Sequence, residues 1–277
     1  MIYIVREVIN IMSEYSNKAM LSLLNMINEM YRKGIEIRRI TKTCALLLMS
    51  GLSKHDIPHC IIEKCLKNQN EDGGFIGNSD TIWNIKFFEF FPEYSNERLK
   101  ALKWLMSDNG NEAGYGRSKR DVHRIPVTGI ALYLIPELIN KDNLKWLELT
   151  WMSEINSLTY KAAYTILAFN TSKSNPINKD IIKDTAEWLV SQQTSNGGYG
   201  PWLGHPIGEN VYCTSVAILA LVSMFDKKYN SVIKAGYNYL CNTQLKNGIW
   251  PYHEIEDGTS WGLFALSKAE EYLEGKA

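Results

Sequence analysis

The sequence predicts an all-α protein built as one closed (α/α)6 ring of six helical hairpins, twelve helices in all. Apolar residues recur at helical spacing along nearly the whole chain, and the alternation typical of strands is scarce. A short motif also repeats at intervals of roughly 40 to 50 residues, which is typical of a helical array. We therefore expect residues 1–277 to form a single domain, with residues 1–12 as an N-terminal extension that packs on the ring.

The motif is an aromatic-aliphatic pair, three residues, a Gln or Asn, and then a glycine turn closed by an aromatic residue. The clearest copies are KAGYNYLCNTQLKNGIW at 234–250 and AEWLVSQQTSNGGYGPW at 186–202. A third copy lies at 100–115, with Asn109 as the amide, and a fourth, with its helical half eroded, lies at 69–75. Each copy predicts the end of one helix and the turn into the next.

One further copy is expected near residue 151, because the copies at 100–115 and 186–202 are nearly two periods apart. Trp146, Leu147 and Trp151 keep the spacing there, with Trp in place of the amide. We expect the aromatic-aliphatic pair to be buried and the amide to bond unpaired carbonyls at the end of its own helix. Glycine then turns the backbone, and the closing aromatic packs on the neighbouring repeat.

Six segments have one polar face and are expected on the outside of the ring: 13–32, 57–69, 95–108, 141–155, 178–193 and 228–243. Six others are apolar on nearly every side, as expected for helices that are buried all round. These inner segments are 41–52, 79–91, 125–138, 158–170, 210–225 and 259–272. Because the two kinds alternate, the inner helices run in parallel around a central cavity and their N-terminal ends share one mouth. Unpaired amides there favour anions and carboxylates, so we expect the functional site at this mouth.

The repeated motif resembles the QW motif of the squalene and oxidosqualene cyclase and protein prenyltransferase superfamily, over about residues 57–270. The resemblance implies a toroid of six helical hairpins that handles a small hydrophobic isoprenoid. Protein prenyltransferases pair such a toroid with a separate helical subunit, so the resemblance also implies a partner subunit as one possibility.

The sharpest candidate for chemistry is the acidic turn before the last predicted inner helix. Residues 257–260, Asp-Gly-Thr-Ser, are similar to the Asp-Cys-Thr-Ala motif of oxidosqualene cyclases, class II enzymes that protonate their substrate. The resemblance implies Asp257 as the general acid, and we expect Glu254 or His253 to tune it. Protonating an alkene needs a strong acid, which arises where hydrogen bonds and nearby charge stabilise the carboxylate in a dry pocket. The alternative is that Asp257 only caps the helix.

Aromatic faces are well suited to hold the carbocation that follows protonation. The residues expected to line the cavity and bind substrate are Asp80, Trp83, Tyr160, Tyr212, Cys213, Trp261 and Phe264. Trp202 and His205 lie on a long loop over the mouth, which either forms a lid or is an ordinary exposed loop.

Four basic residues follow the glycine turn of the copy at 100–115, where an inner helix begins: Arg117, Lys119, Arg120 and Arg124. They predict a diphosphate site, since phosphate accepts both forked Arg and Lys contacts, and a solvated basic loop is the alternative. Protonation requires no metal, although Mg²⁺ often accompanies a diphosphate. Asp121 and His123 have the shape of a prenyltransferase zinc pair, but the three or four donors that zinc needs are not found at matching positions.

The composition excludes some classes. Thirty basic and thirty acidic residues cancel, so no electrostatic case for nucleic-acid binding follows. No apolar run approaches the roughly 20 residues of a transmembrane segment, and Arg6 and Glu7 interrupt the opening stretch where a signal peptide would be apolar. We expect a cytoplasmic chain with five reduced cysteines.

These features predict an isoprenoid-processing enzyme, with a class II-like terpene cyclase as the main hypothesis. A non-catalytic toroid that binds an isoprenoid, a peptide or a partner protein is the first alternative. A prenyltransferase-like toroid or a glycoside hydrolase is the second, and in a hydrolase Asp80 and Asp257 could be the two carboxylates.

Overall fold

The computed structural model describes residues 13–108, 113–154 and 157–275. Within these ranges the regular structure is entirely helical, with twelve α-helices and four short 3-10 helices. The expected N-terminal extension, residues 1–12, lies outside the described residues, as does Asn109 of the third motif copy.

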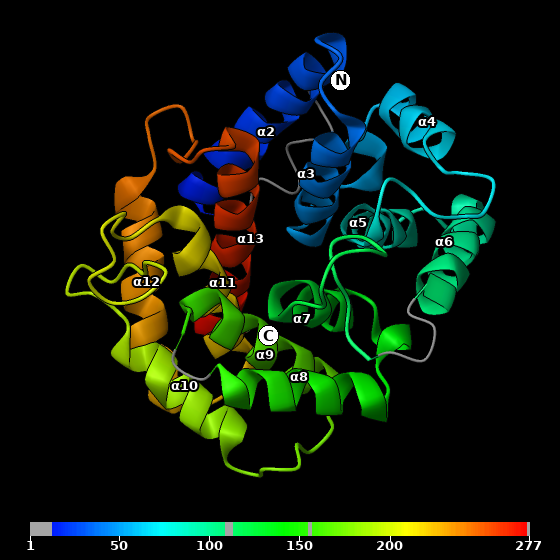
Figure 1. Ribbon diagram of the computed structural model, residues 1–277. Coiled ribbons are helices and arrows are strands. Elements are labelled where there is room, and N and C mark those ends of the chain that lie inside the picture. Colours follow the sequence, from blue (N-terminus) through cyan, green and yellow to red (C-terminus); the bar gives the residue numbers. More distant parts are fainter. Residues whose placement is uncertain (1–12, 109–112, 155–156, 276–277) are drawn as a thin grey trace.

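The predicted alternation of outer and inner helices is confirmed (Figure 1). The outer helices are α2 (Glu14–Arg32), α4 (His59–Lys67), α6 (Ser95–Asp108), α8 (Lys141–Ser153), α10 (Ile181–Ser191) and α12 (Asn230–Thr243). The inner helices are α3 (Ile37–Met49), α5 (Asn78–Glu89), α7 (Ile125–Leu134), α9 (Thr159–Ser172), α11 (Val211–Ser223) and α13 (Ile255–Leu273).

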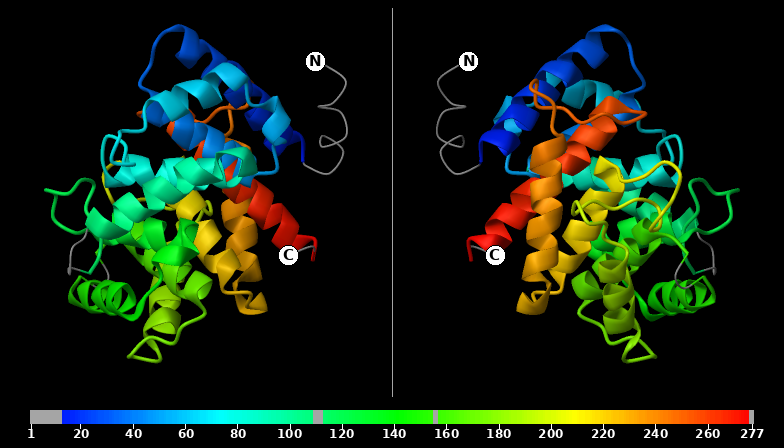
Figure 2. Two further views of the ribbon diagram at one scale, coloured as in Figure 1. Left: turned by 90° about the vertical axis from the view of Figure 1, so that its right-hand side faces the viewer. Right: turned by 90° about the vertical axis from the view of Figure 1, so that its left-hand side faces the viewer.

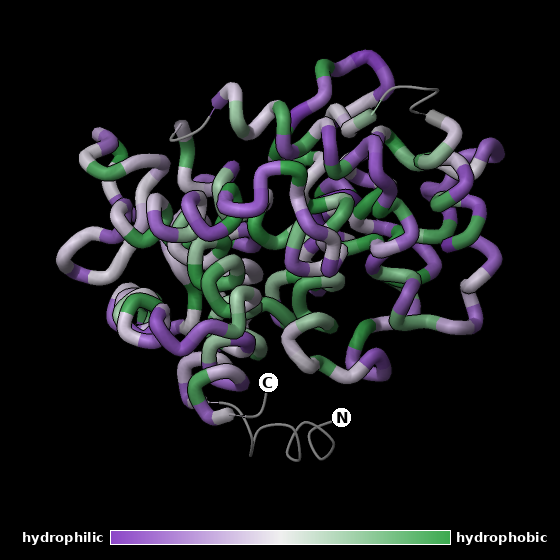
Figure 3. The backbone as a smooth tube through the Cα atoms, turned by 90° about the horizontal axis from the view of Figure 1, so that it is seen from below, coloured by the Kyte–Doolittle hydropathy of each residue, from purple (hydrophilic) through white to green (hydrophobic). Residues whose placement is uncertain are grey.

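The ring is closed by contact between its ends. Each inner helix contacts the next, and α13 returns to contact both α2 and α3. The side views show this closure as the last helix lying beside the first hairpin (Figure 2). Apolar segments gather in the interior and polar ones follow the periphery (Figure 3), as the burial of inner-helix side chains requires.

Two inner helices begin four residues earlier than predicted. α3 begins at Ile37, and its apolar spacing through Ile40 and Cys44 continues the helical period back into the basic residues. α13 begins at Ile255, which places Asp257 inside its first turn, where the helix dipole stabilises a negative charge. The N-cap position is Glu254, so the interpretation of Asp257 as the cap is wrong.

The motif glutamines join each glycine turn to the next hairpin. Gln193 Nε2 donates to the carbonyl oxygens of Gly197, 3.0 Å away in its own turn, and of Val232, 2.9 Å away in the first turn of α12. Gln69 and Gln244 make the corresponding two bonds. The expected bond to the end of the same helix is therefore wrong, because the amide crosses to the neighbouring outer helix instead.

The degenerate copy near residue 151 keeps this connection by other means. Trp151 is fully buried, and its Nε1 donates to Thr185 Oγ1 in α10 at 2.8 Å. A second repeated connection was not anticipated: the amide of the closing aromatic donates to a threonine of the following inner helix. Tyr199 N lies 2.9 Å from Thr214 Oγ1, and three other copies have the same bond. These bonds fix the start of each inner helix at the mouth.

Candidate active site

Two cavities open at the mouth, where the inner helices begin. A charged pocket of about 220 Å³ lies among the first turns of α3, α5 and α13. Its side chains that matter here are Arg38, Arg39, Lys42, Asp80, Trp83 and Asp257. A tyrosine pocket of about 690 Å³ lies among the starts of α9 and α11 and the segment that leads into α13. Its side chains that matter here are Pro201, Tyr160, Ile207, Glu209, Tyr212 and Tyr252.

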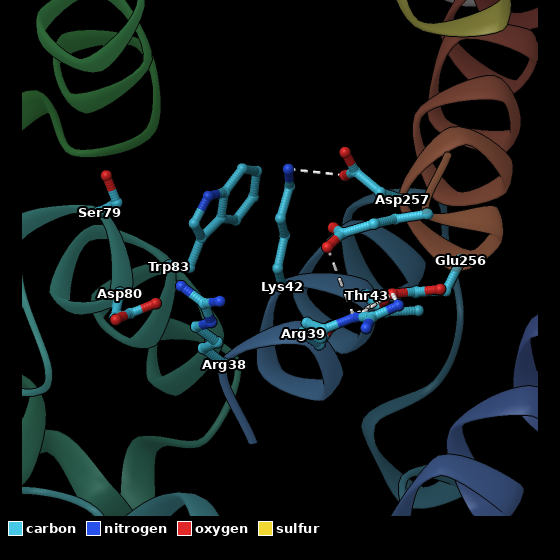
Figure 4. A pocket seen from close by; sticks show the side chains of 10 residues that line it. Arg38, Arg39, Lys42, Thr43, Ser79, Asp80, Trp83, Glu256 and Asp257 are labelled. Carbon is cyan, nitrogen blue, oxygen red and sulfur yellow. Dashed lines mark hydrogen bonds and ion pairs between the residues drawn. The ribbon is translucent and has the colours of Figure 1, made fainter. Parts of the chain in front are cut away.

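Ion pairs between α3 and α13 cross the charged pocket (Figure 4). Lys42 Nζ lies 2.6 Å from Asp257 Oδ1, and both side chains are largely buried. Arg39 bonds the carboxylate of Glu256 and lies 3.9 Å from that of Glu254. Because α3 and α13 are the first and last inner helices, these pairs also hold the ring closed.

Asp80, on α5, differs from the other carboxylates of this pocket. None of the described residues forms an ion pair with it, and Figure 4 shows it on the side of the pocket away from Asp257. Burial raises the pKa of Asp80, while the nearby Arg38 cation opposes the increase and Glu36 adds to it. Its surroundings therefore favour the protonated carboxyl.

An aromatic cage lies beside the Lys42–Asp257 pair. The Lys42 ammonium is 5.4 Å from the ring centroid of Trp83 and 5.7 Å from that of Trp261. The two indoles meet edge to face at 5.9 Å. Tyr164 of α9 also meets Trp261, at 6.3 Å. Since α5, α9 and α13 are not neighbours in the ring, these rings meet across its axis, so side chains divide the predicted central cavity at this level.

Tyr212 stands between the cage and the tyrosine pocket. Its ring meets Trp261 edge to face at 5.9 Å and stacks on Tyr252 at 6.0 Å. Its hydroxyl lies 2.9 Å from that of Tyr164. Burial raises the pKa of both Tyr212 and Tyr164, so both hydroxyls stay neutral hydrogen-bonding groups. Burial likewise raises the pKa of the Cys213 thiol, to about 11, which makes it a poor nucleophile.

The predicted residues are thus distributed over two sites. Asp80, Trp83 and Asp257 line the charged pocket, as does Glu254, whereas Tyr160, Tyr212, Cys213 and His253 line the tyrosine pocket. Trp261 and Phe264 are packed in the interior, each 1% exposed.

The two residues expected to tune Asp257 have other partners. Glu254 faces Arg39, and His253 packs on the ring of Tyr252 at 4.1 Å. Among the described residues, neither forms a hydrogen bond or ion pair with Asp257. On the loop over the mouth, Trp202 is 42% exposed and packs edge to face on His205.

The basic loop borders the charged pocket, because Ser79 N donates to the carbonyl oxygen of Arg117 at 3.3 Å. Arg117 and Arg124 both bond the carboxylate of Asp121, at 3.0 and 2.9 Å. These bonds hold the pKa of Asp121 far below its usual value. Two of the four cations expected to bind diphosphate therefore already share one carboxylate within the loop.

The other two cations of the loop are placed differently. The Lys119 ammonium lies 4.6 Å from the ring centroid of Trp104, and Arg120 is exposed. Nowhere in the part of the chain that the structure describes do three or more His, Cys, Asp or Glu side chains gather closely enough to hold a metal.

Sequence reasoning missed Arg38, Arg39 and Lys42. The early start of α3 brings them to the mouth, and the run of apolar residues at 37, 40 and 44 was the signal that could have placed them there. Without Lys42, neither the ion pair to Asp257 nor the occupant of the aromatic cage could be anticipated.

The family model of the prenyltransferase alpha-alpha toroid domain matches residues 137–261. The match covers just under half of the chain, and the fold of the described residues is the alpha-alpha toroid that this model describes. A comparison with curated proteins gives no sequence match. None of the helices in the described ranges has the length and apolar character needed to cross a membrane.

Solved structures share the fold of this toroid. The type II terpene cyclase MstE from Scytonema matches with a TM-score of 0.71 at 14% identity, over 93% of this chain and 98% of that chain. A variant of that cyclase in complex with its substrate, geranylgeranyl dihydroxybenzoate, matches at 0.67 and 14%, over 93% and 99%. A glycosyl hydrolase of family 88 from Bacteroides vulgatus matches at 0.58 and 11%, over 91% and 98%. At these identities the likeness concerns the fold.

Proposed function

We propose that this toroid is an isoprenoid-processing enzyme of the class II terpene cyclase kind, which protonates a double bond of a prenyl substrate. The observation that carries the proposal is the position of the Lys42 ammonium. It lies against the faces of Trp83 and Trp261 and beside the carboxylate of Asp257. The site thus already stabilises a positive charge at the position where the carbocation would form.

The proton transfer follows from this arrangement. A prenyl chain that enters the cage displaces the ammonium of Lys42, whose side chain is 28% exposed. Asp257 then lacks its counterion in a largely buried site, and we assign its carboxyl as the proton donor. The carboxyl gives its proton to one alkene carbon, and the positive charge on the other carbon lies against Trp83 and Trp261. A second double bond attacks that carbon, and loss of a C–H proton to solvent or a base yields a cyclic isomer of the substrate.

Asp80 is the second candidate for the acid. It lines the same pocket, its pKa is raised by burial, and no described residue pairs with it. Where the substrate carries a diphosphate, we propose that Arg117, Lys119, Arg120 and Arg124 contact it, with Asp121 competing for two of them.

Purified protein incubated with a panel of polyprenyl alcohols and diphosphates should give a cyclised isomer, detected by gas chromatography and mass spectrometry. Asp257→Asn should abolish the product. If Asp80→Asn abolishes the product and Asp257→Asn does not, Asp80 is the acid. Asp184→Asn, a change on the exposed face of α10, is the matched control. Full activity in Asp257→Asn would remove that residue as the acid, and a folded protein that converts none of the panel would overturn the function.

A non-catalytic toroid that binds an isoprenoid, a peptide or a partner protein is the second candidate. The Lys42–Asp257 pair favours this binding function, because the two side chains neutralise each other in the absence of a ligand. Prenyl lipid retained through purification, with no turnover, would select this function. Release of sugar from a glycoside by the same protein would instead select a hydrolase. The five free cysteines support a cytoplasmic location, which we also propose.

A further inference from the structure

We infer that the tyrosine pocket binds the hydrocarbon chain of a prenyl ligand, and that Tyr212 is a movable partition between this chain site and the charged pocket. The identity of the ligand rests on the proposed function. The location of the chain does not, because it can be measured by binding alone.

The sizes of the two pockets separate their roles. Pockets that bury a small ligand typically measure about 300–1,000 Å³. The charged pocket, at about 220 Å³, falls below that range, and the tyrosine pocket, at about 690 Å³, falls within it. The charged pocket can therefore admit one end of a ligand, while the rest of a long chain must lie elsewhere.

The lining of the tyrosine pocket suits an apolar chain. Ring faces of Tyr160, Tyr212 and Tyr252, together with Pro201 and Ile207, supply most of it. No Lys or Arg is among the described side chains that line it, and Glu209 and His253 are its charged or titratable residues besides the tyrosines and Cys213, so the pocket offers no permanent cation to a phosphate or carboxylate head group. The charged pocket holds three such cations, and the two sites together match an amphiphile with one polar end.

Tyr212 is the side chain that separates the two sites. It contacts Tyr160 and Tyr252 on the pocket side and Trp261 on the cage side. Its hydroxyl bonds only that of Tyr164 among the described residues. Rotation of this one ring would break its hydrogen bond to Tyr164 and its ring contacts, and we infer that it would join the pocket to the cage. The start of α13 packs closely on Tyr252, since a Cβ on Gly258 would lie 2.5 Å from the Cβ of Tyr252.

Two exposed isoleucines make a matched pair for testing this site. Ile207 lines the tyrosine pocket and is 75% exposed, whereas Ile177 is 69% exposed and lines neither pocket. A tryptophan at either position is accommodated without disturbing the core. Ile207→Trp should obstruct the pocket and weaken binding of geranylgeraniol at least about tenfold, a difference that titration resolves readily. Ile177→Trp should leave the Kd unchanged.

Photocrosslinking locates the chain directly. Geranylgeraniol carrying a terminal diazirine should label Tyr160 or Tyr252 in the wild-type protein. In Tyr212→Phe, which loses the bond to Tyr164 but keeps the ring, labelling should extend to Trp83 or Trp261. Labelling confined to Asp80 and Trp83, with no effect of Ile207→Trp, would overturn the inference. So would tight binding of a soluble oligosaccharide in place of the prenyl probe. Binding in the tyrosine pocket without any cyclised product would leave this inference standing and refute the proposed catalysis.

Discussion

Replacing Gly197 by alanine should destabilise the ring far more than replacing Gly204, although both glycines have a left-handed backbone. Their φ angles are 90° and 81°. A Cβ on Gly197 would lie 2.3 Å from the carbonyl oxygen of Ala235 in α12, whereas a Cβ on Gly204 would meet no atom within 4 Å. Gly204→Ala therefore measures the cost of the backbone conformation alone, about 1–2 kcal/mol. Gly197→Ala must also displace the next outer helix, which adds about 1–3 kcal/mol.

Urea denaturation of the two variants and the wild type measures this difference as a free energy of unfolding. The variants should differ by about 1–3 kcal/mol, which corresponds to about 2–10 °C in Tm for a domain of this size. Equal losses in the two variants would show that the close approach of turn and helix contributes nothing. The role assigned to glycine in the repeat would then be refuted.

Two further predictions test the repeat and the site. Gln193→Met keeps the size of the side chain but removes the donor of two hydrogen bonds, so the free energy of unfolding in urea should fall by about 1–3 kcal/mol. Because burial raises the pKa of Asp80 in the folded state, the protonated carboxyl favours folding at low pH. This contribution to the free energy of unfolding is lost as the pH rises through the folded-state pKa. Asp80→Asn should therefore raise Tm at pH 7 and leave it nearly unchanged at pH 3, and equal shifts at the two pH values would contradict this.

Most of the architecture could be predicted because it depends on local sequence patterns. The motif at 186–202 and 234–250 marks where one helix ends and the next begins, and burial on all sides distinguishes α11 from an outer helix such as α10. Even the copy centred on Trp151 could be found, since its spacing survives the loss of the amide. The destination of each motif glutamine could not be predicted, because the carbonyl it reaches belongs to another helix, 28 residues further along for Gln69, 39 residues further along for Gln193, and in the first helix of the ring for Gln244.

The candidate site was predicted less well, for a reason of geometry. Side chains such as Trp83 and Trp261 could be assigned to inner helices, but whether they line a hollow or meet across the axis depends on distances between helices that no local pattern encodes. Lys42 shows the same limit. Its helix start was misplaced by four residues, and a basic residue near a helix start reads as solvent-exposed until its partner Asp257 is known.

The acidic turn that resembles a cyclase motif also closes the ring, and these two roles can be separated experimentally. The Lys42 and Asp257 side chains are 28% and 14% exposed, so the pair is intermediate between a surface and a buried ion pair, and its net contribution to stability should be about 1 kcal/mol. Lys42→Met removes the ammonium and leaves both the carboxyl and the cage, whereas Asp257→Asn removes the carboxyl and leaves the ammonium over the indoles.

If the pair only holds the ring together, both variants and the double variant should lose similar stability and similar activity in a double-mutant cycle. If Asp257 is the acid, Lys42→Met should retain turnover and bind the prenyl chain more tightly, because no ammonium must be displaced, while Asp257→Asn should be inactive at unchanged stability. Equal loss of turnover in the two single variants would assign the turn to ring closure and leave Asp80 as the remaining candidate acid.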